Sequence, residues 1–141
     1  MKLLATFFYV GYLPIAPGTW ATLAGLPIAW FFNENLGWLT VIFSLVGLVI
    51  CKPAKEVFNA KDPGCFVLDE VAGMMVSVLW LPKNLALYGM AFILFRLLDI
   101  SKPGLIRKIQ NCKASTSIMW DDLLAGAVVN VVLQVFVRLV I

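Results

Sequence analysis

Five carboxylates lie at or just inside the ends of apolar segments: the adjacent pairs Asp69-Glu70 and Asp121-Asp122, and the single Asp99. A charge at the centre of a membrane helix costs about 2.5–3.5 kcal/mol, and less near the interface. Five such charges without partners would cost on the order of 10 kcal/mol, which is comparable with the net stability of a whole protein. They must therefore be hydrated, paired with basic side chains or neutralised by a cation.

The residue types narrow the chemistry that these acids could perform. The chain has no histidine, which excludes histidine-nucleophile phosphatases, Ser-His-Asp triads and HExxH zinc sites. No cysteine is followed six positions later by an arginine, and no aspartate begins an Asp-x-Asp motif. A set of carboxylate oxygens without histidine or cysteine is typical of sites for the hard cation Mg²⁺ rather than zinc. The sequence therefore predicts Mg²⁺ as the cofactor.

Asp99 lies in a stretch that also carries Arg96 and Lys102 and ends at Pro103. Proline lacks an N–H and disfavours a helical conformation in the preceding residue, so the helix should end near Lys102. An acid at a helix C-terminus opposes the helix dipole. The alternative that all five acids are solvated helix-start residues thus accounts well for Asp121 and Asp122 and less well for Asp69, but it fails for Asp99. Arg96 and Asp99 share a helix face, so Arg96 is either the structural partner of Asp99 or a phosphate ligand.

Composition predicts a membrane protein built from helices. Of 141 residues, 62% are hydrophobic and 13% charged, whereas soluble domains have about 45–50% and about 25%. We expect an all-α, multi-helical integral membrane bundle that forms a single domain over residues 1–141. Residues 1–13 are treated as mature sequence rather than a signal peptide, because the 14–19 loop leads straight into another apolar segment. The expected apolar helices cover residues 20–32, 36–51, 66–81, 85–100 and 123–141.

Loop charge predicts the orientation of this bundle. The net charge of +3 comes mostly from connecting segments, and we see no basic stripe suited to nucleic acid. The two basic loops, residues 52–61 and 102–113, are expected on the cytoplasmic side. The helices at 66–81 and 85–100 form an antiparallel pair between them and return the chain to that side. All five acids should therefore converge at the cytoplasmic boundary, together with Thr19 and Lys102.

Glycines mark two further features. Gly18-Thr19 stands where an N-cap belongs for the helix at 20–32, and a helix N-terminus can bind an anion. Gly73 follows Asp69 by four residues and Gly126 follows Asp122 by four, so each acid has a small residue one turn away on its own face. Both helices should pack closely around those faces. The three cysteines, Cys51, Cys65 and Cys112, suit free thiols in a reducing cytoplasm.

Four motifs occur in the order and spacing of the phosphatidylglycerophosphatase A family, which this chain resembles over nearly its whole length. The resemblance implies an enzyme of the bacterial cytoplasmic (inner) membrane that uses Mg²⁺ to hydrolyse phosphatidylglycerophosphate to phosphatidylglycerol and phosphate. Its substrate would be a phospholipid of the cytoplasmic leaflet. The motifs are Pro17-Gly18-Thr19, Asp69-Glu70-Val71-Ala72-Gly73, Phe95-Arg96-Leu97-Leu98-Asp99-Ile100-Ser101-Lys102-Pro103 and Asp121-Asp122-Leu123-Leu124-Ala125-Gly126.

Roles follow for each residue under this hypothesis. Mg²⁺ would polarise the phosphoryl oxygens and activate water. Arg96 and Lys102 would hold the phosphate, Arg96 through a bidentate fork and Lys102 as a point charge, and the backbone of Gly18-Thr19 could add N–H donors. One or two metal ions, and attack by water or by an aspartate, stay open. The predicted Mg²⁺ ligands are Asp69, Glu70, Asp99 and Asp122, with Asp121 in support.

Two alternatives differ in class or substrate. Acids within membrane helices also mark ion pathways, so a small divalent-cation channel or transporter is one. The clustering of the acids at one boundary argues against it, as do Arg96 and Lys102, which would hinder a cation. The other is a phosphatase of a different lipid phosphate or an alcohol phosphotransferase, since no residue pattern reads the lipid head group. The oligomeric state stays open.

Overall fold

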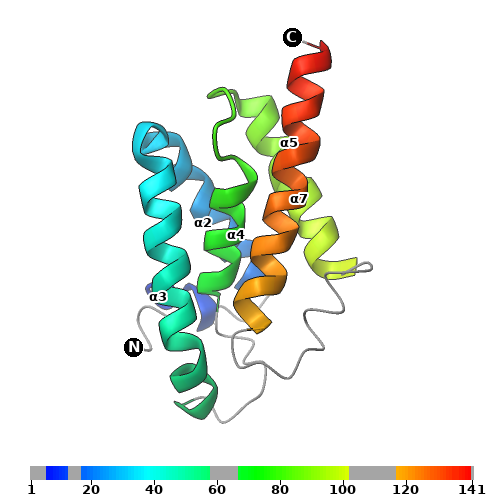
Figure 1. The fold of residues 1–141 in the computed structure, drawn as a ribbon. Coiled ribbons are helices and arrows are strands. Elements are labelled where there is room, and N and C mark those ends of the chain that lie inside the picture. The colour runs from blue at the N-terminus through cyan, green and yellow to red at the C-terminus, as the bar shows by residue number, and fades with distance from the viewer. Residues whose placement is uncertain (1–5, 13–16, 58–66, 102–116, 141) are drawn as a thin grey trace.

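The computed structural model describes residues 6–12, 17–57, 67–101 and 117–140 (Figure 1). Within these ranges every regular element is a helix and there is no strand, which confirms the predicted all-α class. Two short 3-10 helices, η1 (Val10–Tyr12) and η2 (Asn33–Asn35), accompany the longer elements. The α-helices are α2 (Pro17–Phe31), α3 (Leu36–Val57), α4 (Leu68–Ser77), α5 (Leu85–Ser101) and α7 (Ser117–Val140).

Helix α4 forms the centre of the bundle. It contacts α2, α3, α5 and α7, and Figure 1 shows it in the middle with the longer helices around it. Eight of its ten residues are buried. The chain direction alternates, so the starts of α2, α4 and α7 and the ends of α3 and α5 lie at the same end of the bundle (Figure 1). This is the convergence that the loop pattern predicts.

Two helical segments, Asn33–Ile50 and Met119–Val140, are long and apolar enough to cross a membrane. They correspond to the predicted spans 36–51 and 123–141. Their outer faces carry large apolar side chains that are exposed, a surface that suits lipid rather than water. Together with the composition, this indicates a membrane protein. The exposed side chains of these segments include Trp38, Val41, Ile42, Leu45, Val49, Val131, Val132, Val135, Phe136 and Leu139.

Helix α4 is shorter than the predicted span at 66–81. Ten residues rise about 15 Å, roughly half of a hydrocarbon core, so the prediction that this segment crosses the membrane as one helix is wrong. The helix ends at Ser77, and Trp80 adopts a left-handed φ of 62°. The carbonyls released there accept hydrogen bonds from α7. The Asn130 amide donates to Leu79 O at 2.7 Å and to Ser77 O at 3.3 Å, and Gln134 donates to Leu79 O at 3.3 Å.

Other helix boundaries also differ from the predictions. Helix α2 begins at Pro17 rather than at residue 20, because proline is well suited to a first helical turn, so Thr19 lies inside the helix and the predicted N-cap is wrong. Helix α3 continues through Pro53 to Val57, so the polar segment predicted to start at residue 52 begins within the helix. Helix α5 agrees with its prediction, and its start is capped by Asn84, which accepts hydrogen bonds from two backbone N–H groups.

Helix α7 begins at Ser117, six residues before its predicted start at residue 123. The additional turn includes Met119, which is fully buried. Its side chain occupies the space over Gly47 of α3, where a Cβ would collide with it. Asp121 and Asp122 therefore lie inside α7, just after its first turn, and not ahead of the helix as the sequence predicts.

Candidate functional site

Close packing of α4 against α7 sets the position of the acids. A Cβ added at Gly126 would collide with the carbonyl oxygen of Gly73. A Cβ added at Gly73 would lie 2.8 Å from the carbonyl oxygen of Asp122 and 2.7 Å from the ring of Phe95. The two helices therefore approach backbone to backbone, as the glycine spacing predicts. One turn away, this approach brings the acids at the start of α4 against those of α7.

The five carboxylates fall into two sets that share one member. In the first set, oxygens of Asp69, Asp121 and Asp122 all lie within 4.8 Å of one another. In the second, oxygens of Glu70, Asp99 and Asp122 do so. Three helices contribute, since α4 supplies Asp69 and Glu70, α5 supplies Asp99, and α7 supplies the other two. Asp122 is the only acid common to both sets.

These side chains are shielded from water. Asp69, Asp121 and Asp122 are 5%, 4% and 2% exposed, and the Asp99 side chain is 11% exposed. Three buried oxygens have no hydrogen-bond partner among the described residues, Asp69 Oδ1, Glu70 Oε2 and Asp122 Oδ2. At a separation of 4.8 Å, two like charges repel by about 3–4 kcal/mol at an effective dielectric constant of about 20. The cluster therefore needs protons or a cation to be stable.

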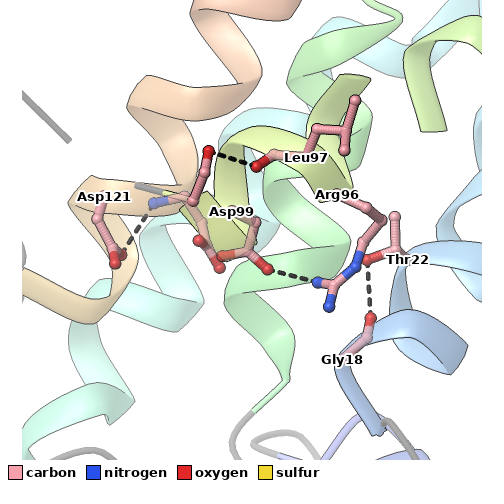
Figure 2. A network of polar contacts seen from close by, with 8 residues as sticks. Gly18, Thr22, Arg96, Leu97, Asp99 and Asp121 are labelled. Atoms are coloured by element: carbon pink, nitrogen blue, oxygen red, sulfur yellow. Dashed lines mark hydrogen bonds and ion pairs between the residues drawn. The ribbon is translucent and has the colours of Figure 1, made fainter. Parts of the chain in front are cut away.

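Arg96 lies at one side of this cluster. Its guanidinium forms an ion pair with Asp99 three residues later, and Figure 2 shows it reaching from α5 toward both Asp99 and the start of α2. A Cβ added at Gly18 would lie 2.9 Å from Glu70 Oε1 and 3.3 Å from Arg96 Nη1. The start of α2 thus covers Glu70 and Arg96 closely. The Nε of Arg96 is buried without a hydrogen-bond partner among the described residues, so this arginine has a donor left for a ligand while it pairs with Asp99.

Of the remaining residues singled out in the sequence, some lie within the described residues and others do not. Gly18 and Thr19 lie in the first turn of α2, beside the second carboxylate set. Lys102 lies outside the described residues, and so do Cys65 and Cys112 and the side chain of Cys51. Thr22, which the sequence analysis did not single out, donates from Oγ1 to Gly18 O at 2.7 Å (Figure 2).

Two other residues missed by the sequence analysis are Asn130 and Gln134. They hydrogen-bond the carbonyls at the C-terminal end of α4, the end opposite to its two acids. The sequence could have indicated them, because they are polar side chains four residues apart inside an apolar membrane segment. Polar groups there cost free energy unless they find a hydrogen-bond partner.

The donor set fits a hard divalent cation. Among the described residues, the candidate ligands are all carboxylate oxygens, three of these oxygens are buried without a hydrogen-bond partner, and the five acids outnumber the guanidinium of Arg96 beside them. Oxygen ligands of this kind are those that Mg²⁺ prefers in proteins. A phosphate bound next to the cation would meet the Nε of Arg96.

Comparison with known proteins bears on what this site does. The model of the family described as phosphatidylglycerophosphatase A matches residues 3–137 of the chain. The chain belongs to this family. Phosphatidylglycerophosphatase A of Escherichia coli K12 is 35% identical over 133 residues, which cover 89% of this chain and 77% of that protein. Phosphatidylglycerophosphatase A of Haemophilus influenzae is 33% identical over 136 residues, with 89% and 82% covered.

A third relative carries a different substrate in its name. A protein of Bacteroides thetaiotaomicron, provisionally named a phosphatidylinositol-3-phosphatase, is 35% identical over 136 residues, which cover 88% of this chain and 85% of that protein. No solved structure is significantly similar to this chain. Membership of the phosphatidylglycerophosphatase A family therefore establishes a lipid phosphatase relationship, while the relatives differ in the head group named.

Proposed function

We propose that this protein is a Mg²⁺-dependent phosphatase that hydrolyses phosphatidylglycerophosphate to phosphatidylglycerol and phosphate. Family membership over residues 3–137 supports the reaction and the lipid substrate. The observation that carries the metal dependence is the buried oxygen-only cluster with partnerless carboxylate oxygens next to Arg96. A phosphomonoester adds negative charge beside the carboxylate cluster, and a metal cation together with the Arg96 guanidinium would neutralise that charge.

The roles of the residues follow from their positions. Asp69, Glu70, Asp99 and Asp122 hold the metal ion, with Asp121 in support. When bound, Mg²⁺ neutralises charge on the phosphoryl oxygens and lowers the pKa of water. Arg96 donates to a phosphoryl oxygen while Asp99 fixes its guanidinium in place. Lys102, three residues after Asp99 in the sequence, adds a second cation to the phosphate, and the N–H groups of Gly18 and Thr19 add donors.

The proposed location is the bacterial cytoplasmic membrane with the site facing the cytoplasm. The acids lie at the end of the bundle where α3 and α5 finish (Figure 1). The basic segment 52–61 starts in the last turns of α3 and continues past its end, and the basic segment 102–113 follows α5 in the sequence. Positively charged segments next to membrane helices stay on the cytoplasmic side, so the substrate is drawn from the cytoplasmic leaflet.

A second candidate function is hydrolysis of a phosphoinositide. It is favoured by one observation, that the Bacteroides thetaiotaomicron relative matches this chain as well as the Escherichia coli relative does. The chemistry at phosphorus would be the same, and only the alcohol that leaves would differ.

Phosphate release by purified protein in detergent tests both candidates. The panel is phosphatidylglycerophosphate, phosphatidylinositol 3-phosphate and phosphatidic acid, each with Mg²⁺ and with excess EDTA. We expect release from phosphatidylglycerophosphate only with Mg²⁺. Preference for phosphatidylinositol 3-phosphate would favour the second candidate, and full activity in EDTA would refute the metal dependence.

A pair of variants makes this test specific to the site. Asp99→Asn should abolish turnover and leave the protein folded, because it keeps the shape of the side chain while removing its charge. The matched control is Glu34→Gln, which removes an exposed carboxylate in η2 at the other end of the bundle. Normal turnover in Asp99→Asn would show that this acid has no part in the reaction.

A further inference from the structure

The carboxylates divide into two sets rather than forming one ring around a single centre. Each set has three acids whose oxygens lie within 4.8 Å of one another, and the sets have only Asp122 in common. Donors around one Mg²⁺ lie at about 2.0–2.1 Å from the ion, so oxygens that bind the same ion are close neighbours. Two separate sets of this kind indicate two ion positions.

Asp122 has the geometry of a shared ligand. Its residue is 2% exposed, and its Oδ2 is buried without a hydrogen-bond partner among the described residues. A carboxylate has two oxygens, and each can bind a different ion. Enzymes that use two metal ions for phosphoryl chemistry hold them about 3.5–4 Å apart, a spacing that one bridging carboxylate can span.

Each set also offers a buried oxygen of its own. Asp69 Oδ1 in the first set and Glu70 Oε2 in the second have no hydrogen-bond partner among the described residues. Because Asp69 and Glu70 are consecutive on α4, their side chains diverge by about 100° around the helix axis. The two acids of α4 therefore serve different positions, whereas the adjacent Asp121 and Asp122 of α7 both belong to the first set.

We propose that the cluster binds two divalent cations, one held by Asp69, Asp121 and Asp122 and the other by Glu70, Asp99 and Asp122, with Asp122 bridging them. The inference rests on the proposed function only in taking the ligand to be a hard divalent cation. The second position lies beside Arg96 and the start of α2, where the substrate phosphate is expected. The first position lies deeper, between α4 and α7.

Binding of Mn²⁺ tests this without an activity assay. Mn²⁺ accepts the same oxygen ligands and is paramagnetic, so two ions that share a carboxylate give an exchange-coupled spectrum. Purified protein in detergent is titrated with Mn²⁺ by equilibrium dialysis, and the loaded protein is measured by electron paramagnetic resonance. We expect two ions per chain and a coupled spectrum for the wild type and for the control Glu34→Gln.

Variants of acids that belong to only one carboxylate set, here called single-set variants, distinguish one metal ion from two. Asp121→Asn should retain one ion, at the second position, and Glu70→Gln should retain one ion, at the first. Both should lose the coupled spectrum, whereas Asp122→Asn should weaken both positions. Each variant is accepted for titration only when gel filtration and circular dichroism match the wild type, and either single-set variant alone suffices for the test.

One ion per chain at saturation in the wild type would overturn the proposal, and so would a coupled pair that survives in Asp121→Asn or in Glu70→Gln. These outcomes are distinct from failure of the proposed function. If the protein binds one ion and hydrolyses phosphatidylglycerophosphate, only the two-ion inference is refuted. If the protein binds two coupled ions and releases no phosphate from any lipid of the panel, only the proposed function is refuted.

Discussion

Replacing Gly73 with alanine should displace α7 and with it two of the five carboxylates, Asp121 and Asp122. A Cβ at this position would lie 2.7 Å from two ring carbons of Phe95 and 2.8 Å from the carbonyl oxygen of Asp122. Ordinary contacts of this kind begin near 3.4 Å, so α4 and its neighbours must separate by about 0.6–0.7 Å. The contacted carbonyl belongs to the residue that both carboxylate sets share, so the displacement moves Asp122 directly.

The expected effects follow from that distance. Overpacking of this size costs about 1–3 kcal/mol of stability, which should appear as a lower unfolding temperature in detergent. A displacement approaching 1 Å at a reacting centre costs up to about 100-fold in rate, so we expect a loss of about 10- to 100-fold in phosphate release. Mn²⁺ affinity should fall as well, because the ligands from α4 and α7 no longer meet.

Gly37 provides the matched control for this substitution. It is also a helical glycine, in the first turn of α3, and a Cβ there would have no heavy atom within 4 Å. Gly37→Ala should keep wild-type activity and an equal or slightly higher unfolding temperature. If Gly73→Ala matches Gly37→Ala in rate and in unfolding temperature, the backbone contact between α4 and α7 does not position the site, and the reasoning is refuted.

Two further predictions concern the start of α2 and the end of α4. Gly18→Ala puts a Cβ 2.9 Å from the Glu70 carboxylate. Because the end of the Glu70 side chain can shift, the unfolding temperature should change little, whereas turnover should fall and KM for substrate should rise. An unchanged kcat/KM would contradict this prediction. Asn130→Leu removes the 2.7 Å donor to Leu79 O and leaves only the longer contact from Gln134 at 3.3 Å, which should cost about 0.5–1.5 kcal/mol of stability. An unfolding temperature for Asn130→Leu equal to that of the control Asn35→Leu, an exposed site in η2, would show that the hydrogen bond is dispensable.

The convergence of the acids could be predicted because it depends on patterns that are local in sequence. Apolar length, loop charge and chain parity require that the starts and ends of the helices alternate between two ends of a bundle. A glycine four residues after an acid lies on the same helix face whatever the partner helix is, so the close approach at Gly73 and Gly126 could also be anticipated.

The length of α4 could not be predicted in the same way. Residues 66–81 are apolar throughout apart from the acids at 69 and 70, and hydropathy does not report where a backbone leaves the helical conformation. That point is set by Asn130 and Gln134, about fifty residues later in the chain. Likewise, the sequence shows that adjacent acids diverge, but only the crossing of three helices decides that Asp122 belongs to both carboxylate sets.

The dependence of α4 on α7 has a consequence for how the protein is made. The peptide groups that end α4 need donors in a hydrocarbon environment, and the donors at Asn130 and Gln134 lie in α7, which is synthesised after α4. During translation, the carbonyls at the end of α4 must therefore bond to water or to other donors until α7 has been made. Helix α4 then packs into the bundle together with α7. Both carboxylate sets include Asp122 of α7, so a chain that lacks α7 has neither set complete.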